Sequence, residues 1–248
     1  MKKIIESIRH KPVTVGLFSR PGFGKTTLLI KMADMLTAKG EKACIISLEE
    51  GEMYIRKRCA MMNIDENKFT INDSVDQSFN DIRAFVSKQS NISVIAIDYI
   101  QLMKTESASL INKLASEFNV PTIDYIQLMK SESSSRINEL ASEFNVPVIY
   151  CSQLSRELST HPLWRPTLQD VKNISTTYGG CVILPPTDLF ISLWRPINIY
   201  HDYDDYDNGG LFPEMIISIL RSTVSGIPEG YIVNALFDKE TASLMFED

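Results

Sequence analysis

The stretch VTVGLFSRPGFGKTTLLIKMADM, residues 13–35, constrains the fold more than any other part of the chain. It opens with a short apolar, β-branched run, passes through a turn rich in proline and glycine, and ends in a segment with regularly spaced apolar residues. Such a run before a turn predicts a buried strand, and the spacing of Leu28, Leu29, Met32 and Met35 predicts an amphipathic helix. We therefore expect a strand–turn–helix unit of the kind that builds parallel α/β sheets.

The turn between this strand and helix has the composition of a phosphate-binding loop. The backbone N–H groups of residues 22–25 and the positive end of the helix would cradle the β- and γ-phosphates of a nucleotide. Lys25 would reach those phosphates, its ammonium otherwise pointing to solvent, and the Thr26 hydroxyl would ligate Mg²⁺. The pattern G-x-x-x-x-G-K-[ST] fails at its first glycine, because Ser19 stands there. A glycine-rich turn with a chance Lys-Thr pair is the alternative. The candidate nucleotide-binding residues are Ser19, Arg20, Pro21, Gly22, Phe23, Gly24, Lys25, Thr26 and Thr27.

Charge and cysteine content limit the partners and the compartment. A formal charge of −6 over 248 residues argues against a surface coated in basic residues, so binding of nucleic acid needs a local cluster, such as a channel formed on assembly. The four cysteines are widely spaced and form no C-x-x-C pair, which favours free thiols in a reducing compartment. No stretch has the length of a membrane span or the pattern of a secretory signal. We expect a cytoplasmic protein with no membrane partner and a single domain over residues 1–248.

Strand and helix patterns alternate through the first two thirds of the chain, which predicts a mostly parallel central sheet flanked by helices on both faces. Strands are expected at residues 13–18, 43–48, 93–98 and 146–152. Helices are expected at residues 26–38, 52–62 and 78–88 and after Met103 and Met129. The last third changes character, with further strands expected at residues 189–194, 215–220 and 231–237 and an acidic surface loop at residues 201–210.

Residues 97–122 and 123–148 are near-copies of each other. The blocks IDYIQLMKTESASLINKLASEFNVPT and IDYIQLMKSESSSRINELASEFNVPV differ at five positions. Two copies are too few for a solenoid, so we interpret them as a tandem duplication of one strand-end, helix and strand-start unit. Two arrangements stay open: the sheet carries an extra strand that bears Asp124, or one copy is extruded.

Carboxylates at strand ends are the candidates for metal binding and for activation of water. Asp98 follows the apolar residues 94–97 and would lie at the ligand-binding edge of a buried parallel strand, where it can hold the Mg²⁺ shell. Asp124 competes for this role; its own strand contains Pro121, which cannot donate to a sheet ladder, but the second copy is directly connected to the strand that follows. We therefore favour Asp98. Glu49 follows another strand and can orient the attacking water, although a solvated acidic turn would have the same sequence.

Four motifs in this order resemble the ATPase domain of the DnaB-type replicative helicases, a branch of the RecA-like motors. They are SRPGFGKTT at residues 19–27, SLEE at 47–50, IDYIQLM at 97–103 and SQLSRE at 152–157. The resemblance implies a RecA-like P-loop NTPase fold with a C-terminal β-hairpin, the cofactors ATP and Mg²⁺, single-stranded DNA as a partner and a homo-hexameric ring. A helicase loader or a primase is a further partner that it implies. The family's N-terminal primase-interacting domain is not expected, because the phosphate loop begins within the first twenty residues.

Carried over residue by residue, the resemblance assigns a role to each motif. Lys25 becomes the phosphate-binding residue, Thr26 a Mg²⁺ ligand and Glu49 the base that activates water. Asp98 becomes the carboxylate of the Mg²⁺ shell, and Gln153 the sensor that couples the γ-phosphate to DNA-binding loops. Without the family, Gln153 would be taken as the polar end of a strand.

The last third is similar to the family but departs from it. Arg221 matches the first basic position of a Lys-x-Arg finger that reaches the neighbouring subunit's site, and Thr223 stands at the second. Such a finger stabilises transition-state charge, so a weakened one implies a slow ATPase or a different arrangement. Residues 165–173 resemble the start of a DNA-facing loop and equally a plain surface loop. Two functions follow: a motor that couples ATP hydrolysis to translocation on single-stranded DNA, and a non-translocating ATP-binding switch with weak or no ATPase activity.

Overall fold

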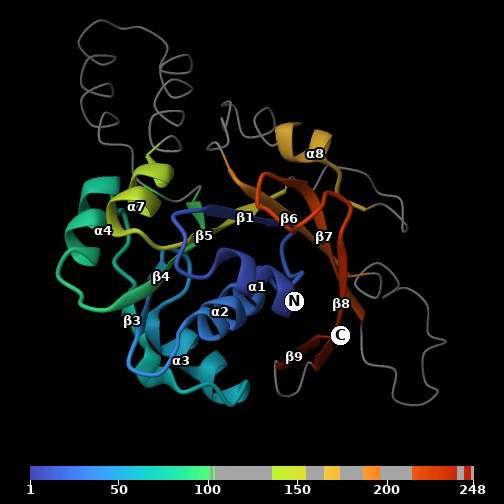
Figure 1. Ribbon diagram of the computed structural model, residues 1–248. Coiled ribbons are helices and arrows are strands. Elements are labelled where there is room, and N and C mark those ends of the chain that lie inside the picture. The colour runs from blue at the N-terminus through green and yellow to red at the C-terminus, as the bar shows by residue number, and fades with distance from the viewer. Residues whose placement is uncertain are drawn as a thin grey trace, which may run out of the picture.

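The computed structural model describes residues 1–100, 103, 136–154, 165–173, 187–195, 214–238 and 243–246. Within these residues the chain forms one nine-stranded sheet in the order β3-β2-β4-β5-β1-β6-β7-β8-β9 (Figure 1). The pairs from β3 to β6 are parallel and those from β6 to β9 are antiparallel. The strands are β1 (Thr14–Ser19), β2 (Lys42–Ser47), β3 (Phe69–Asn72), β4 (Ile92–Asp98), β5 (Val148–Gln153), β6 (Leu189–Trp194), β7 (Glu214–Ser222), β8 (Ile232–Asp238) and β9 (Ser243–Phe246).

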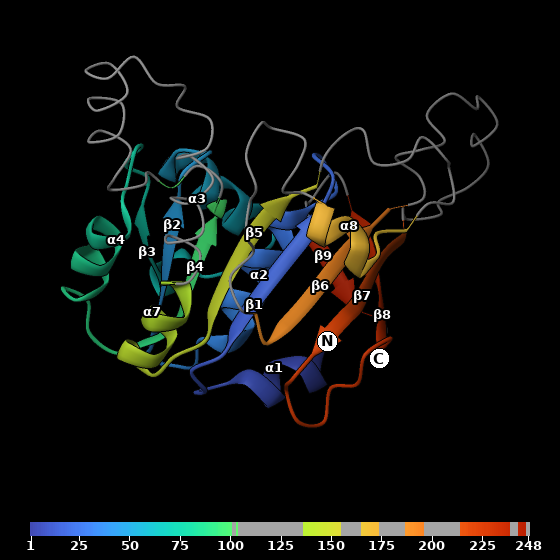
Figure 2. The same ribbon diagram turned by 90° about the horizontal axis from the view of Figure 1, so that it is seen from above.

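Helices cover both faces of this sheet, as the alternating pattern predicts. One face packs against α1, α2 and α3, and the other against α4, α7 and α8 (Figures 1 and 2). The helices are α1 (Lys2–Ile8), α2 (Lys25–Leu36), α3 (Glu52–Met61), α4 (Phe79–Val86), α7 (Ile137–Phe144) and α8 (Leu168–Asn173), with a short 3₁₀ turn η1 (Glu66–Lys68) before β3. No helix in the described part of the chain is long and apolar enough to cross a membrane.

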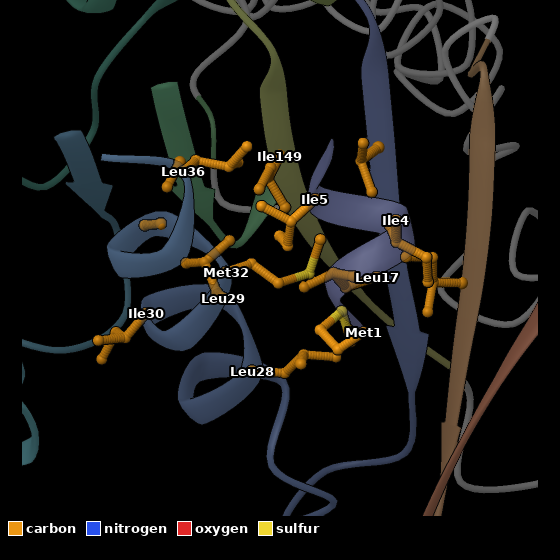
Figure 3. Close-up of a cluster of buried hydrophobic side chains, with 14 of the residues drawn as sticks. Met1, Ile4, Ile5, Leu17, Leu28, Leu29, Ile30, Met32, Leu36 and Ile149 are labelled. Carbon is orange, nitrogen blue, oxygen red and sulfur yellow. The ribbon is translucent and has the colours of Figure 1, made fainter. Parts of the chain in front are cut away.

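The two hydrophobic cores follow from the alternation of side chains along buried strands. In β1, Leu17 points toward α2 while its neighbour Phe18 packs on the opposite face, because successive residues of a strand face opposite sides. The first core joins α1 to α2 through Ile4, Ile5 and Leu28, all of which are fully or almost fully buried (Figure 3). Burial of each such side chain contributes about 1.5–3 kcal/mol, so α2 is held firmly beneath the strands that carry the candidate site.

All seven predicted strands are confirmed to within about two residues at each end, as β1, β2, β4, β5, β6, β7 and β8. Helix α7 begins eight residues after Met129, and the helix expected after Met103 lies outside the described residues. The short elements α1, η1, β3, α8 and β9 were not predicted, and α8 lies where a loop was expected. Strand β3 has only four residues, and only its first, Phe69, is buried, so it lacks the apolar run that marked the central strands.

The duplicated blocks contribute different parts to the sheet. Strand β4 ends at Asp98 in the first copy, whereas α7 and the first residue of β5 belong to the second. Strands β4 and β5 pair directly, with Ile95 opposite Val148, so the described sheet has no extra strand between them. Asp124 lies outside the described residues.

Candidate functional site

The turn between β1 and α2 has the backbone of a phosphate-binding loop. Gly22 and Gly24 adopt φ angles of 76° and 90°, a region that side chains other than glycine rarely occupy. A Cβ atom at Gly24 would also lie 2.7 Å from the Cε atom of Met215 in β7. The two glycines therefore let the loop turn tightly and expose backbone N–H groups at the start of α2. Of the other candidate residues in this loop, Phe23 and Thr27 are buried, and Arg20 and Pro21 are partly buried.

Lys25, the first residue of α2, is buried rather than directed to solvent. Lys25 is only 9% exposed. Its Nζ donates to the carbonyl oxygen of Ser19 at 3.3 Å and to that of Arg20 at 3.1 Å. The expectation that this ammonium otherwise points to solvent is wrong, because the loop folds over it. Burial lowers the pKa of Lys25, while the neighbouring groups of Cys151, Asp98 and Glu49 act in the opposite direction.

Thr26 and Asp98 meet beneath the loop. The Thr26 hydroxyl donates to Asp98 Oδ2 at 2.7 Å, and Asp98 is only 1% exposed at the end of β4. Burial raises the pKa of Asp98, whereas the hydrogen bond from Thr26, the neighbouring Cys151 thiol and the charge of Lys25 lower it. The threonine oxygen and a buried carboxylate are hard oxygen ligands of the kind that Mg²⁺ prefers, so this pair can hold a magnesium ion beside a phosphate.

Glu49 lies on the turn that follows β2, within electrostatic reach of Asp98 and Lys25. The Leu48 N–H donates to the Asp98 carbonyl oxygen at 2.6 Å, which ties this turn to the end of β4. Partial desolvation raises the pKa of Glu49, and the carboxylates of Asp98 and Glu50 raise it further. An exposed carboxylate with increased basicity can accept a proton from water, which is the chemistry expected of a general base.

Gln153 ends β5 beside the start of the phosphate loop. It is paired in register with Ser19, the last residue of β1. The N–H of the next residue, Leu154, donates to the Ser19 carbonyl oxygen at 2.9 Å. The structure therefore brings Gln153 to the same edge of the sheet as Lys25 and Asp98.

Arg221 is not part of this cluster. Strand β7 starts beside the phosphate loop and runs away from it, and Arg221 near its far end pairs with Phe190 of β6. The guanidinium carbon of Arg221 lies 6.0 Å from the centre of the Phe190 ring. The second finger position, Thr223, is held within its own subunit, where its Oγ1 donates to Asp188 Oδ1 at 3.0 Å.

Two further residues near the site, Cys151 and Arg58, have no clear signal in the sequence. Cys151 of β5 lies beside Asp98 and influences the pKa of its carboxylate, a proximity that depends on which strands are neighbours in the sheet. The guanidinium of Arg58 in α3 donates two hydrogen bonds to the Glu50 carboxylate, at 3.0 and 2.6 Å. A basic residue two helical turns after an acidic turn is a weak signal in sequence, since most such pairs are surface contacts.

Comparison with known proteins identifies the family of the chain and agrees with its fold. Residues 10–177 match the family model described as the DnaB-like helicase C terminal domain. No curated protein sequence matches the chain. Among solved structures, the ATPase domain of G40P is similar with a TM-score of 0.69 and 20% identity, over 97% of this chain and 86% of that one. A structure of a DnaB-like replicative helicase, reported with its interactions with primase, has a TM-score of 0.68 and 21% identity, over 95% of this chain and 59% of that one.

Proposed function

Because the chain belongs to the family of DnaB-like helicase C-terminal domains, we propose that it is a P-loop ATPase that couples hydrolysis of Mg-ATP to translocation on single-stranded DNA. The observation that carries this proposal is the meeting of Lys25, Thr26, Asp98 and Glu49 around one glycine-supported loop. Positioning and electrostatic stabilisation supply almost all of the catalysis of phosphoryl transfer, and these are the properties that such a cluster provides.

The residues of the site divide into those that bind phosphate and those that hold magnesium. The backbone N–H groups around Gly22 and Gly24 and the ammonium of Lys25 would bind the phosphate oxygens. The Thr26 hydroxyl would ligate Mg²⁺ through its oxygen while it donates its hydrogen bond to Asp98. The Asp98 carboxylate would hold the ligands that surround the ion. Bound Mg²⁺ neutralises charge on the transferring phosphoryl group.

Glu49 would take a proton from the attacking water at its carboxylate. The pKa of this group is raised, and a base is most effective when its pKa approaches the operating pH. Gln153 is paired with Ser19 at the start of the loop. It would contact the γ-phosphate and couple nucleotide binding to the position of the segments that contact DNA.

We further propose that copies of the chain assemble into a hexameric ring, with Arg221 acting on the neighbouring subunit's nucleotide. Arg221 is exposed and remote from its own phosphate loop, as a residue that serves another subunit should be. A ring also gathers scattered positive charges around a channel, which a chain with a net charge of −6 needs in order to bind DNA. The family relationship suggests a helicase loader or a primase as a further partner and the cytoplasm as the compartment.

One observation favours a second function, a non-translocating ATP-binding switch. Thr223 occupies the second finger position and is anchored to Asp188 of its own subunit, so only one basic residue is left to stabilise transition-state charge. A protein of this kind would bind Mg-ATP firmly and hydrolyse it slowly, and nucleotide would control assembly or partner binding instead of movement.

ATP turnover measured with and without single-stranded DNA tests the proposal. We expect DNA to stimulate turnover in the parent protein, and Lys25→Ala to lower it at least about a hundredfold, because phosphate charge is no longer stabilised. Lys31→Ala, a partly buried lysine on the same helix, is the matched control and should leave turnover unchanged. Parental turnover in Lys25→Ala would refute the phosphate-loop assignment, and firm nucleotide binding without DNA-stimulated turnover in the parent would favour the switch.

A further inference from the structure

A second group that can donate a hydrogen bond, the thiol of Cys151, lies beside Asp98 in addition to Thr26. Strands β4 and β5 are parallel neighbours with Ile97 opposite Tyr150, so Asp98 and Cys151 follow one position later on adjacent strands. Cys151 is completely buried and faces the same side of the sheet as α2, so its thiol lies beside the Asp98 carboxylate and influences the pKa of that group. An ionised carboxylate only accepts hydrogen bonds, so the thiol would be the donor in a hydrogen bond between the two groups.

The two donors approach Asp98 from different elements. Thr26 reaches Oδ2 from the first turn of α2, and Cys151 approaches from the neighbouring strand β5. The terminal torsion of an aspartate side chain has a broad energy profile, so packing alone does not fix the plane of its carboxylate. Two donors on separate rigid elements do fix it, and with it the direction in which the free lone pairs point.

The surroundings keep Cys151 in the form that can donate. Burial raises the pKa of the Cys151 thiol well above its ordinary value, and the negative charge of Asp98 raises it further. The group is therefore a neutral S–H at neutral pH.

We propose that Cys151 is a positioning residue for magnesium, whose thiol orients the Asp98 carboxylate toward the Mg²⁺ shell of the bound nucleotide. This inference rests on the proposed Mg-ATP site. Groups that hold metal-site carboxylates in place typically affect metal affinity by about ten- to a hundredfold when they are removed. A thiol is a weak donor, so we expect an effect at the lower end of that range.

Cys151 also belongs to the hydrophobic core beneath the sheet, together with Leu17 and Ile149. Variants must therefore separate donation from packing. Cys151→Val fills the space without a donor, Cys151→Ala removes both, and Cys151→Ser keeps a donor in a slightly smaller side chain. Cys44 is the matched control, since it is a fully buried strand cysteine whose pKa is raised, to about 12, by burial alone.

The experiment measures equilibrium binding of a fluorescent ADP to the full chain in Mg²⁺ and in EDTA. The ratio of the two dissociation constants reports how strongly magnesium supports nucleotide binding, and it requires no turnover. We expect Cys151→Val and Cys151→Ala to reduce this ratio about tenfold, mainly by weakening binding in Mg²⁺. Cys151→Ser should keep most of the ratio, and Cys44→Val should keep all of it.

The outcomes separate this inference from the proposed function. If the parent ratio is large and folded Cys151→Val or Cys151→Ala retains it, the positioning role is refuted while the Mg-ATP site stands. An equal loss in Cys151→Ser and Cys151→Ala would also refute it, because packing would then explain both. If Cys151→Val does not fold, the comparison of Ala with Ser decides. If the parent protein binds the nucleotide equally well with and without Mg²⁺, the proposed function and this inference are both refuted.

Discussion

The duplication can be removed in two ways that produce chains of equal length. Deleting residues 99–124 joins Asp98 to Tyr125 and keeps the second copy, whereas deleting residues 123–148 keeps the first copy. The products differ only at the five positions that distinguish the blocks. Because α7 and the start of β5 come from the second copy, we expect the first deletion to give the more stable protein.

The largest contribution to this difference comes from Val148. It is fully buried in β5 and lies between Thr14 of β1 and Ile95 of β4. After deletion of residues 123–148 its place is taken by Thr122, which brings a hydroxyl into the core. A buried polar group without a partner costs about 1–3 kcal/mol, and exchange of valine for threonine does not conserve the chemistry of the site.

Arg136 adds a smaller contribution. Its guanidinium carbon lies 4.0 Å from the centre of the Phe79 ring, and the side chain donates to Asn80 Oδ1 at 3.0 Å. The first copy has Leu110 in this place, which makes neither interaction. A cation–π contact at a partly exposed position contributes about 0.5–1 kcal/mol. Together, the two replacements should make the chain lacking residues 123–148 less stable by about 1.5–4 kcal/mol.

Urea unfolding of the two deletion proteins, followed by circular dichroism, measures this difference in the free energy of unfolding. Val148→Thr and Arg136→Leu in the full chain are the matched controls and should together account for most of it. Equal stabilities, or a greater stability of the chain lacking residues 123–148, would show that the second copy's distinctive residues do not determine the packing of α7 and β5. The reasoning from Val148 and Arg136 would then be wrong.

Four further predictions concern nucleotide binding and turnover. Glu49→Gln should retain nucleotide binding and lose turnover at least about a hundredfold, because the amide keeps the shape but cannot take a proton; equal loss of both would make Glu49 structural. Only the ionised form of Glu49 is a base, and its pKa is raised. As the pH is lowered, turnover of the parent protein should therefore begin to fall at a pH above the ordinary glutamate pKa. A decrease in turnover that begins only at or below that pKa would contradict this prediction. Asp98→Asn should impair Mg²⁺-dependent nucleotide binding more than Asp124→Asn. The reverse order would refute the assignment of Asp98 to the magnesium site. Mixing Arg221→Ala with Lys25→Ala subunits should restore part of the turnover, because some neighbouring subunits then form a complete site. If the mixed oligomers form but turnover does not recover at any mixing ratio, Arg221 does not act across the subunit boundary.

The central architecture was predictable because its signals are local. Strands β1, β2, β4 and β5 are short apolar runs in sequence and are buried strands in the sheet. Parallel strands bring their carboxyl ends to one edge, so the proximity of Glu49, Asp98 and Gln153 to the loop follows once these strands are recognised. The glycines at positions 22 and 24 likewise indicate a backbone that other residues would strain.

Other features depend on contacts between distant segments. The partner of Asp98 in β5 could not be read from the sequence, because it depends on β4 and β5 being neighbours in a particular register. The burial of Lys25 was missed because the loop, and not the local helix pattern, covers the ammonium. In the duplication, sequence alone did not show which copy supplies the helix before β5, since both carry the same helical pattern. In the structure α7 comes from the second copy, whose Arg136 lies over the ring of Phe79.

The charges of the site support one another, and this affects how any single variant should be interpreted. The ammonium of Lys25 lowers the pKa of Asp98, and the carboxylates of Asp98 and Glu49 raise that of Lys25. Replacing Lys25 with alanine therefore removes a phosphate ligand and also makes Asp98 easier to protonate, so part of the resulting loss belongs to the magnesium site. Groups coupled in this way give non-additive effects. The Lys25→Ala, Asp98→Asn double variant should consequently lose less than the two single losses combined, and the shortfall in nucleotide affinity measures how far the phosphate and magnesium sites act as one unit.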